Sequence, residues 1–332
     1  MPVTIKDIAR ETSLALSTIS KYMNGGNVRA KNAKLIDEAI ERLGYRPNIM
    51  AKSLRNAKSY TIGIVVPTME DPFCAKVVEK IEQILQTYGY SCALCCYHSK
   101  QQIRENSVQF LLQKNVDAVF IFANQLIQNN ELQISDTKIP LIILNRYISN
   151  IHTDYVLPDI AGGIYSAAEF LIQRHRKPAL MTGTESLDDE DCTGYLRAHK
   201  DYHLEVRDQF IVHTPEHFFH LLGTADAPDS LIISDYQLYT ETVSLALTRK
   251  LNIPDCFSLI ACDNTKFSEI MVPPITSVSY PVEEMAEAAV RILQKRLADD
   301  YSDYPCISRL KTKLCVRESV SFADQTYASG QD

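Results

Sequence analysis

The sequence predicts an α/β protein with a small helical head, and three observations support this fold class. Three short amphipathic helices fit into the first 46 residues, and strand-like and helical segments alternate from residue 60 onward. The alternation restarts near residue 160, which indicates two halves, each a doubly wound parallel sheet with helices on both faces. With 332 residues, 45% of them hydrophobic, the chain is long enough to bury such a core.

Charge separates the head from the rest of the chain. Residues 1–58 carry a net charge of +6, whereas the whole chain carries −7. A basic head on an acidic body favours a polyanion as the partner of the head, and accidental asymmetry of a solvated surface is the alternative. The sequence has neither an apolar run of about 18 residues nor a signal-peptide core, so we expect a cytoplasmic protein that does not enter a membrane.

The nine cysteines are an odd number without regular spacing, and we expect reduced thiols. Cys92, Cys95 and Cys96 fall in a predicted buried strand, Tyr90–Tyr97, where side chains alternate between faces, so we expect no metal site there. The sequence contains no phosphate-binding loop and no nucleophile elbow. We therefore predict neither an enzyme nor a cofactor.

The head fits a helix-turn-helix, with a plain three-helix bundle as the alternative. Thr4 can cap a first helix, a second helix runs from about Leu16 to Met23, and a third runs from about Ala30 to Leu43 and closes at Gly44. The third helix should bury the following side chains: Leu35, Ile36, Ala39, Ile40 and Leu43.

The second helix exposes side chains that suit contact with DNA. Leu16, Ser17, Ser20 and Lys21 are compact enough to enter a major groove. Thr18, Ser20 and Asn24 could hold phosphate groups.

Several motifs resemble the lactose/galactose-repressor family of bacterial regulators. They are Val3-Thr4-Ile5-Lys6-Asp7-Ile8-Ala9, Ser17-Thr18-Ile19-Ser20-Lys21, Asn24, and Leu43-Gly44-Tyr45-Arg46-Pro47-Asn48 with Ala51 and Leu54. The resemblance implies a core like the periplasmic binding proteins. It also implies three parts: a DNA-binding head (1–46), a hinge (47–58) and an effector-binding, dimerising core (59–332). The core would have an N-subdomain (59–157 and 281–320) and a C-subdomain (158–280).

By this resemblance, Leu16, Ser17 and Lys21 are the main base-reading residues, with Lys21 where the family commonly has Arg. Ser13 replaces a turn glycine, and Ala15 replaces the Ser or Thr that caps the recognition helix. Losing that cap costs about 0.5–2 kcal/mol, so we expect a less ordered head when DNA is absent.

In the hinge, Asn48 would cap a short helix, Ala51 would let two such helices approach, and Leu54 would wedge into a minor-groove step. Twelve residues are marginal for an isolated helix, so we expect the hinge to fold only on DNA. An ordinary linker residue is the alternative for Leu54.

Polar and aromatic residues follow the predicted strands of the core, where ligands of open α/β sheets bind. The effector candidates are Asp71, Phe73, Asn145, Arg146, Asp191, His213, Ser234, Asp263 and Tyr280. The resemblance supports Phe73, Asn145, Ser234 and Asp263 as contacts. Asp235 and Asp263 could each cap a helix instead, and we interpret Asp235 as a cap and Asp263 as a ligand contact.

Asp191 departs from the family, which commonly has an Arg three residues before the Gly194-Tyr195 pair. Its run, Asp188-Asp189-Glu190-Asp191, is interpreted as a solvated loop, with a helix opening at Gly194. Arg146, His213 or His217 could replace the missing Arg, or the effector could be cationic or absent.

These observations predict a sequence-specific transcriptional regulator, most simply a repressor. It would bind a pseudo-palindromic operator on double-stranded DNA as a homodimer, under the control of a sugar-type effector. The alternative is a regulator whose core binds a protein corepressor or acts without an effector.

Overall fold

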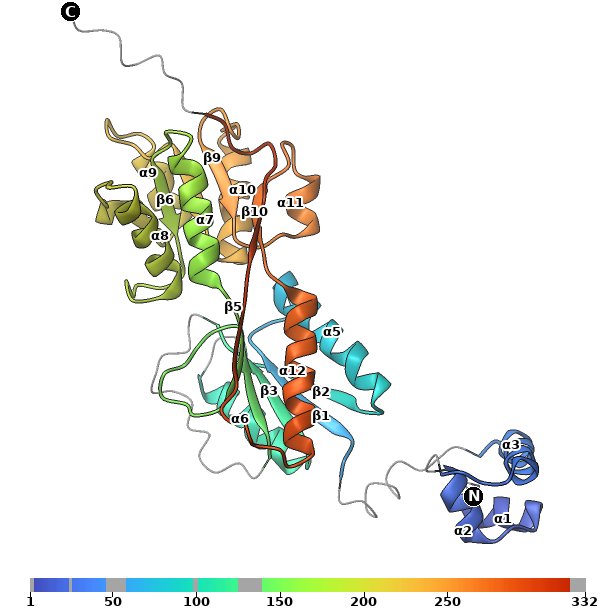
Figure 1. Ribbon diagram of the computed structural model, residues 1–332. Coiled ribbons are helices and arrows are strands. Elements are labelled where there is room, and N and C mark those ends of the chain that lie inside the picture. Colours follow the sequence, from blue (N-terminus) through green and yellow to red (C-terminus); the bar gives the residue numbers. More distant parts are fainter. Residues whose placement is uncertain (1–2, 24–25, 46–57, 98–100, 125–138, 323–332) are drawn as a thin grey trace, which may run out of the picture. The chain divides into compact units, whose positions relative to one another are not determined.

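The computed structural model describes residues 3–23, 26–45, 58–97, 101–124 and 139–322. The chain divides into two compact units, residues 1–59 and 60–332, and each unit is described by itself (Figure 1). Within the described ranges, no helix has both the length and the apolar character that a membrane span requires.

The described part of the first unit contains α1 (Ile5–Thr12), α2 (Leu16–Met23) and α3 (Ala30–Leu43). The predicted second and third helices are confirmed. The end of α3 is also as predicted, because Gly44 takes the left-handed conformation of a C-cap, with φ of +62°.

A small core holds the three helices together, and Ile8, Ile19, Ile36 and Ala39 are its fully buried members. The prediction that Leu35 points inward is wrong, since its side chain is 38% exposed. The buried stripe of α3 passes through the positions i, i+3, i+4 and i+7 that start at Ile36, and Leu35 falls outside that arc.

The first sheet of the second unit has six strands among the described residues, in the order β11-β5-β4-β3-β1-β2, and every neighbouring pair is parallel. Its strands are β1 (Thr61–Val66), β2 (Ser91–Cys96), β3 (Ala118–Phe122), β4 (Leu141–Leu144), β5 (Asp154–Pro158) and β11 (Ile307–Leu310). Two helices, α5 (Pro72–Thr87) and α12 (Val282–Leu297), cover one face, and α6 (Gln101–Gln113) covers the other (Figure 1).

The second sheet runs in the order β12-β10-β9-β8-β6-β7, and it is parallel except for the antiparallel pair β12–β10. Its strands are β6 (Pro178–Met181), β7 (Ile211–Val212), β8 (Ser230–Ile233), β9 (Ser258–Ala261), β10 (Thr276–Ser279) and β12 (Lys313–Cys315). Around it lie α7 (Ile160–Ile172), α8 (Glu190–Asp201), the 3₁₀ turn η1 (Asp208–Phe210), α9 (Pro215–Leu221), α10 (Tyr236–Thr248) and α11 (Lys266–Ile270). Helices α7 and α8 share one apolar core with the sheet, and α9 and α10 share the other, so the predicted α/β class with a helical head is confirmed.

The chain passes between the two sheets three times: after β5, after β10, and between β11 and β12. We expected residues 281–320 to stay with the first sheet, but the structure places the end of this range in the second. There β12 pairs with β10, and the Ser319 hydroxyl donates to the carbonyl of Leu259 at 2.6 Å. Antiparallel pairing with β10 gives Lys313–Cys315 their backbone hydrogen-bond partners, so the chain ends this range in the second sheet.

Two other sequence predictions are corrected. The strand β2 is half-buried rather than buried, because it forms an edge of the first sheet. Helix α8 begins at Glu190 instead of Gly194, because the carboxylate of Asp189 caps it by accepting from the backbone N–H of Asp191 at 3.1 Å. The acidic run is therefore not a solvated loop throughout, since Asp189 is the N-cap and Glu190 and Asp191 form the first turn of the helix, while Asp188 is exposed before it.

Candidate functional site

Helix α2 presents the residues that we predicted to read bases. The side chains of Leu16, Ser17 and Lys21 are exposed, 45% in the case of Leu16, while Ile19 on the opposite face is fully buried. Thr18 and Ser20 are half-buried. An exposed face of this composition matches the helix that a helix-turn-helix lays into a major groove.

Thr4 lies at the start of α1, where its backbone N–H and its hydroxyl both donate to Asp7 Oδ2, at 2.9 and 2.7 Å. It therefore stabilises the first turn, and both of its donors are used within the helix, so contact with a phosphate would require the hydroxyl to leave Asp7. The remaining DNA candidates, Asn24, Asn48, Ala51 and Leu54, lie outside the described residues.

The two departures at the turn have visible structural effects. Ser13 ends α1 in the left-handed region with φ of +55°, a conformation that favours glycine. Ala15 is the N-cap of α2, since its carbonyl accepts from the N–H groups of Thr18 (2.9 Å) and Ile19 (3.2 Å). A methyl side chain at that position cannot accept from the free N–H groups of the first turn.

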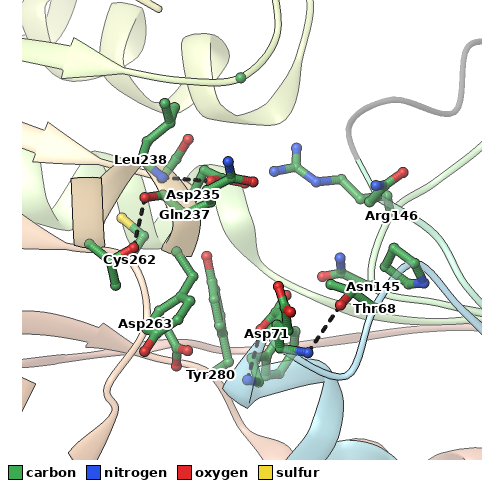
Figure 2. A pocket seen from close by; sticks show the side chains of 18 of the residues that line it. Thr68, Asp71, Asn145, Arg146, Asp235, Gln237, Leu238, Cys262, Asp263 and Tyr280 are labelled. Carbon is green, nitrogen blue, oxygen red and sulfur yellow. Dashed lines mark hydrogen bonds between the residues drawn. The ribbon is translucent and has the colours of Figure 1, made fainter. Parts of the chain in front are cut away.

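In the second unit, a cavity of about 430 Å³ opens at the carboxyl ends of both sheets (Figure 2). Eight of the nine effector candidates line it: Asp71, Phe73, Asn145, Arg146, His213, Ser234, Asp263 and Tyr280. A volume in this range accommodates a small organic molecule. Because both sheets contribute to the walls, a ligand here would contact both halves of the core.

Asp191 is the exception, and the structure gives it a different role. Its side chain is fully buried and does not line the cavity. Its Oδ1 lies 3.0 Å from Nη2 of Arg146, and its Oδ2 accepts from the hydroxyl of Thr182 at 3.0 Å. Nη1 of Arg146 also lies 2.7 Å from Asp189 Oδ1.

Of the three residues that could replace the missing Arg, Arg146 and His213 line the cavity, whereas His217 does not. Burial opposes the charge of Arg146, but the carboxylates of Asp191 and Asp189 outweigh it and raise the pKa of the guanidinium. The positive charge of Arg146 is thus already paired with two carboxylates of the protein.

Asp71 and Asp235 are helix caps that also face the cavity. Asp71 Oδ1 accepts from the backbone N–H groups of Phe73 (2.8 Å) and Cys74 (3.3 Å) at the start of α5. Asp235 Oδ1 accepts from Leu238 N–H at 2.9 Å at the start of α10, so its interpretation as a cap is confirmed. In Figure 2 both carboxylates lie among the residues that surround the cavity.

Asp263 differs from these two because its side chain caps no helix. The short helix α11 is capped by the hydroxyl of Thr265, which accepts from Ser268 N–H at 3.2 Å. Asp263 is 7% exposed, and its Oδ2 is a buried oxygen without a hydrogen-bond partner. Burial raises the pKa of Asp263 to about 7, the nearby Asp71 carboxylate adds to the rise, and Lys76 opposes it.

Aromatic rings form one apolar wall of the cavity. The ring centroids of Phe73 and Tyr280 lie 4.7 Å apart, at an interplanar angle of 44°. Both side chains belong to or pack against the core of the first sheet. Such a wall suits the apolar face of a ring-shaped or hydroxylated ligand.

The sequence predictions missed several residues that line the cavity: Thr68, Glu70, Asn124, Tyr236 and Gln237. The strand-end rule could have found most of them, since Asn124 follows β3 and Tyr236 and Gln237 follow β8. Glu70 and Thr68 lie in the turn between β1 and α5, where no sequence pattern distinguishes a cavity residue from a surface residue.

With this geometry established, the chain can be compared with known proteins. Residues 4–48 match the family described as bacterial regulatory proteins, lacI family. Residues 59–219 match the periplasmic binding proteins and sugar binding domain of the LacI family, and residues 167–320 match the periplasmic binding protein-like domain.

Relatives extend over nearly the whole chain. The chain is 29% identical over 331 residues to catabolite control protein A of Priestia megaterium, over 96% of this chain and 99% of that protein. It is 26% identical over 329 residues to the HTH-type transcriptional repressor PurR of Actinobacillus pleuropneumoniae serotype 5b (strain L20), over 96% and 98% of the two chains. The names of these proteins describe regulators rather than enzymes, as predicted.

Solved structures agree on the fold. The lac repressor dimer bound to operator and the anti-inducer ONPF has a TM-score of 0.80 at 18% identity, over 96% of this chain and 99% of that chain. A complex of the transcriptional regulator CelR with cellobiose has a TM-score of 0.70 at 21% identity, over 96% and 100%. The chain therefore belongs to the lacI family of bacterial regulatory proteins, as a DNA-binding transcriptional regulator with an effector-binding core of periplasmic-binding-protein fold.

Proposed function

We propose that the protein is a transcriptional repressor that binds a pseudo-palindromic operator as a homodimer and responds to a small, sugar-type effector. Residues 1–46 would read each half-site, residues 47–58 would form the hinge, and residues 59–332 would bind the effector and dimerise. The protein would act in the cytoplasm, where bacterial DNA is accessible.

The observation that carries the proposal is the exposed face of α2, where Leu16, Ser17 and Lys21 are presented while Ile19 anchors the helix. The cavity supports the regulatory part. A ligand that contacts both sheets can favour one arrangement of the two halves over another, and only such differential binding can alter the affinity for DNA. The similar proteins support repression rather than activation, since one of them is named a repressor. They also support a sugar as the ligand class, since one solved structure holds cellobiose.

The first experiment selects operators from fragmented genomic DNA with the purified full-length protein and measures affinity by fluorescence anisotropy. We expect Lys21→Ala to weaken operator binding by about tenfold and to relax the base preference, because a base contact is worth roughly 1–3 kcal/mol. Lys34→Ala is the matched control, since it removes the same charge from an exposed position on α3. Equal losses in the two variants would contradict base reading by α2.

A second experiment tests the dimer and the effector. Analytical ultracentrifugation should show a dimer, both free and on DNA. Affinity for the operator should fall steeply with salt, because lysines and arginines that bind phosphates release counterions from the DNA.

A thermal-shift screen against sugars should find a ligand that raises Tm and changes operator affinity. An unresponsive core would favour the alternative of a protein corepressor or an effector-independent regulator.

A further inference from the structure

We propose that the ligand of the cavity is an organic cation, a hydroxylated amine of monosaccharide to disaccharide size. Its ammonium group would bind the carboxyl group of Asp263, in the electrostatic field of the Asp71 and Asp235 carboxylates. This inference rests on the proposed function, because it specifies the chemical class of the effector. The proposed ligand differs from a neutral sugar in one group, because a neutral sugar would carry a hydroxyl where this ligand carries an ammonium.

The charges around the cavity are unbalanced. Four lining residues carry carboxyl groups: Glu70, Asp71, Asp235 and Asp263. Arg146 is the one Lys or Arg among the lining residues, and its charge is already paired with Asp189 and Asp191, which lie outside the lining. The cavity therefore presents an excess of negative charge to whatever enters it.

Asp263 is the strongest indication of a missing partner. Its side chain is 93% buried, its Oδ2 has no hydrogen bond, and the neighbouring helix takes its cap from Thr265 instead. A buried carboxyl oxygen without a donor is costly, and an ammonium group supplies both a donor and the opposite charge. Lys76 acts on Asp263 only through its charge, since its Nζ donates to the backbone carbonyl of Asn264 at 3.4 Å and Asp263 Oδ2 accepts no hydrogen bond from it.

The three carboxylates belong to both halves of the core. Asp71 follows β1 of the first sheet, whereas Asp235 and Asp263 follow β8 and β9 of the second. They are close enough to influence one another, since Asp71 raises the pKa of Asp263 and Asp235 raises the pKa of Asp71, in each case in addition to burial. A cation between them would replace the repulsion between the carboxylates by attraction, and so would hold the two halves of the core together.

The surroundings favour an organic cation over a metal ion. Among the described residues, no group of three or more His, Cys, Asp or Glu side chains is arranged to hold a metal. The rest of the lining suits a hydroxylated molecule. Asn124 has a buried Oδ1 without a partner, Gln237 offers a further amide, and the rings of Phe73 and Tyr280 form an apolar wall. The volume of about 430 Å³ exceeds that needed by a simple alkylamine.

The test is isothermal titration calorimetry on the full-length protein at pH 7 with matched sets of probes. Each set contains an amino sugar, its parent sugar and its N-acetyl derivative: glucosamine, glucose and N-acetylglucosamine, and the corresponding galactose and mannose compounds. The N-acetyl compounds keep the nitrogen but remove its charge. Amino alditols, each paired with its alditol, extend the panel to open-chain amines.

We expect at least one amine to bind tenfold or more tightly than both its hydroxyl and its N-acetyl counterparts. Asp263→Asn, which preserves the shape of the side chain, should reduce that preference at least tenfold. Asp255→Asn is the matched control, because Asp255 is exposed and lies outside the cavity lining, and it should retain the preference. Circular dichroism checks that each variant is folded.

The inference is overturned if no amine in the panel binds more tightly than its hydroxyl counterpart, or if Asp263→Asn retains the preference. These outcomes are distinct from failure of the proposed function. If a neutral sugar binds more tightly than its amine counterpart and changes operator affinity, the proposed function stands and the inference of a cationic ligand is refuted. Failure of the full-length protein to select any operator, either alone or with a ligand of the panel, would refute the proposed repressor independently of the titrations.

Discussion

Arg146 and Asp191 form an ion pair, with 3.0 Å between Nη2 and Oδ1, that joins the end of β4 in the first half of the core to the first turn of α8 in the second. The Asp191 side chain is fully buried and that of Arg146 is 11% exposed. The cation that pairs with Asp191 thus comes from the opposite half of the core.

Arg146→Met should lower the stability of the core by about 3–5 kcal/mol, because it leaves the Asp191 carboxylate buried without its cationic partner. Combining it with Asp191→Leu should recover most of the loss, since only Asp189 then lacks the guanidinium, and its carboxylate is 19% exposed and still accepts from the backbone N–H of residue 191. Urea unfolding followed by fluorescence and circular dichroism measures both effects. A double variant as unstable as Arg146→Met would contradict the pairing, and Lys266→Met at an exposed ion pair is a control that should have little effect.

Asp263 should make stability depend on pH. The pKa of its carboxyl is about 7 in the folded protein and about 4 in the unfolded chain. As pH rises above about 4, the unfolded state ionises first, so the free energy of unfolding falls until Asp263 itself ionises near pH 7. Asp263→Asn should therefore match the native protein near pH 4 and exceed its stability by roughly 2–4 kcal/mol at pH 8.

Several titratable or charged side chains interact electrostatically with the carboxyl group of Asp263: Asp71, Lys76, Tyr236, Tyr239, Cys262 and Tyr280. Burial raises the pKa of Tyr236, Tyr239, Tyr280 and Cys262, so these groups stay neutral between pH 4 and 8. The difference between native protein and variant therefore reports Asp263 together with its coupling to Asp71. Urea midpoints at pH 4, 6 and 8 measure it. A constant difference across this range would show that Asp263 ionises normally.

Gly194 should not tolerate a side chain. A Cβ at this position would collide with the backbone carbonyl of Ala161 and approach the Cβ of Ile164 at 3.0 Å, where α7 and α8 pack together. Gly194→Ala should therefore cost about 1–3 kcal/mol despite the better helix propensity of alanine. Gly223→Ala is the control, because its Cβ would meet His220 O at 3.5 Å, and differential scanning calorimetry should show a lower Tm for Gly194→Ala alone.

The head should become more stable when its two unusual turn residues are replaced. Ser13→Gly removes the strain of a side chain in the left-handed conformation, which should raise the free energy of unfolding of the head by roughly 1 kcal/mol. Ala15→Ser provides an N-cap for α2, which should raise it by about 0.5–2 kcal/mol. Amide exchange of Ile8 and Ile19 without DNA should slow accordingly. Gly44→Ala is the opposite control, since it places a side chain at φ of +62° and should speed exchange of the same amides. Unchanged exchange in Ser13→Gly would show that the turn does not limit the head.

Local signals in the sequence predicted much of this fold. The bounds of α2 and α3 follow from apolar spacing and the glycine at the C-cap of α3, and β3, β4 and β9 are marked by short apolar runs. The strand β5 lacks such a clear signal because it begins with a charged residue. The Asp154 carboxylate is satisfied there by distant partners: Arg296, 142 residues later, donates two hydrogen bonds to it at 2.8 Å each, and the backbone N–H of Cys306 donates a third at 2.8 Å.

The same limit applies to the cavity. The strand-end rule located Asp71, Asn145 and Ser234 at its walls, because it depends only on where each strand stops. It could not predict Asp191, whose partner Arg146 lies 45 residues earlier and whose acidic neighbours suggest a loop. Long-range pairing of charges leaves no periodic trace in the sequence.

The interleaved connections of the core also have a consequence for synthesis. The first sheet needs α12 to cover its face and β11 to complete its edge, and both come from the last sixth of the chain. A ribosome that has made residues 60–280 has therefore exposed an apolar surface that α12 does not yet cover, which attracts chaperones, proteases or other nascent chains. Nonsense mutations between residues 60 and 282 should accordingly leave no stable core and so no functional regulator.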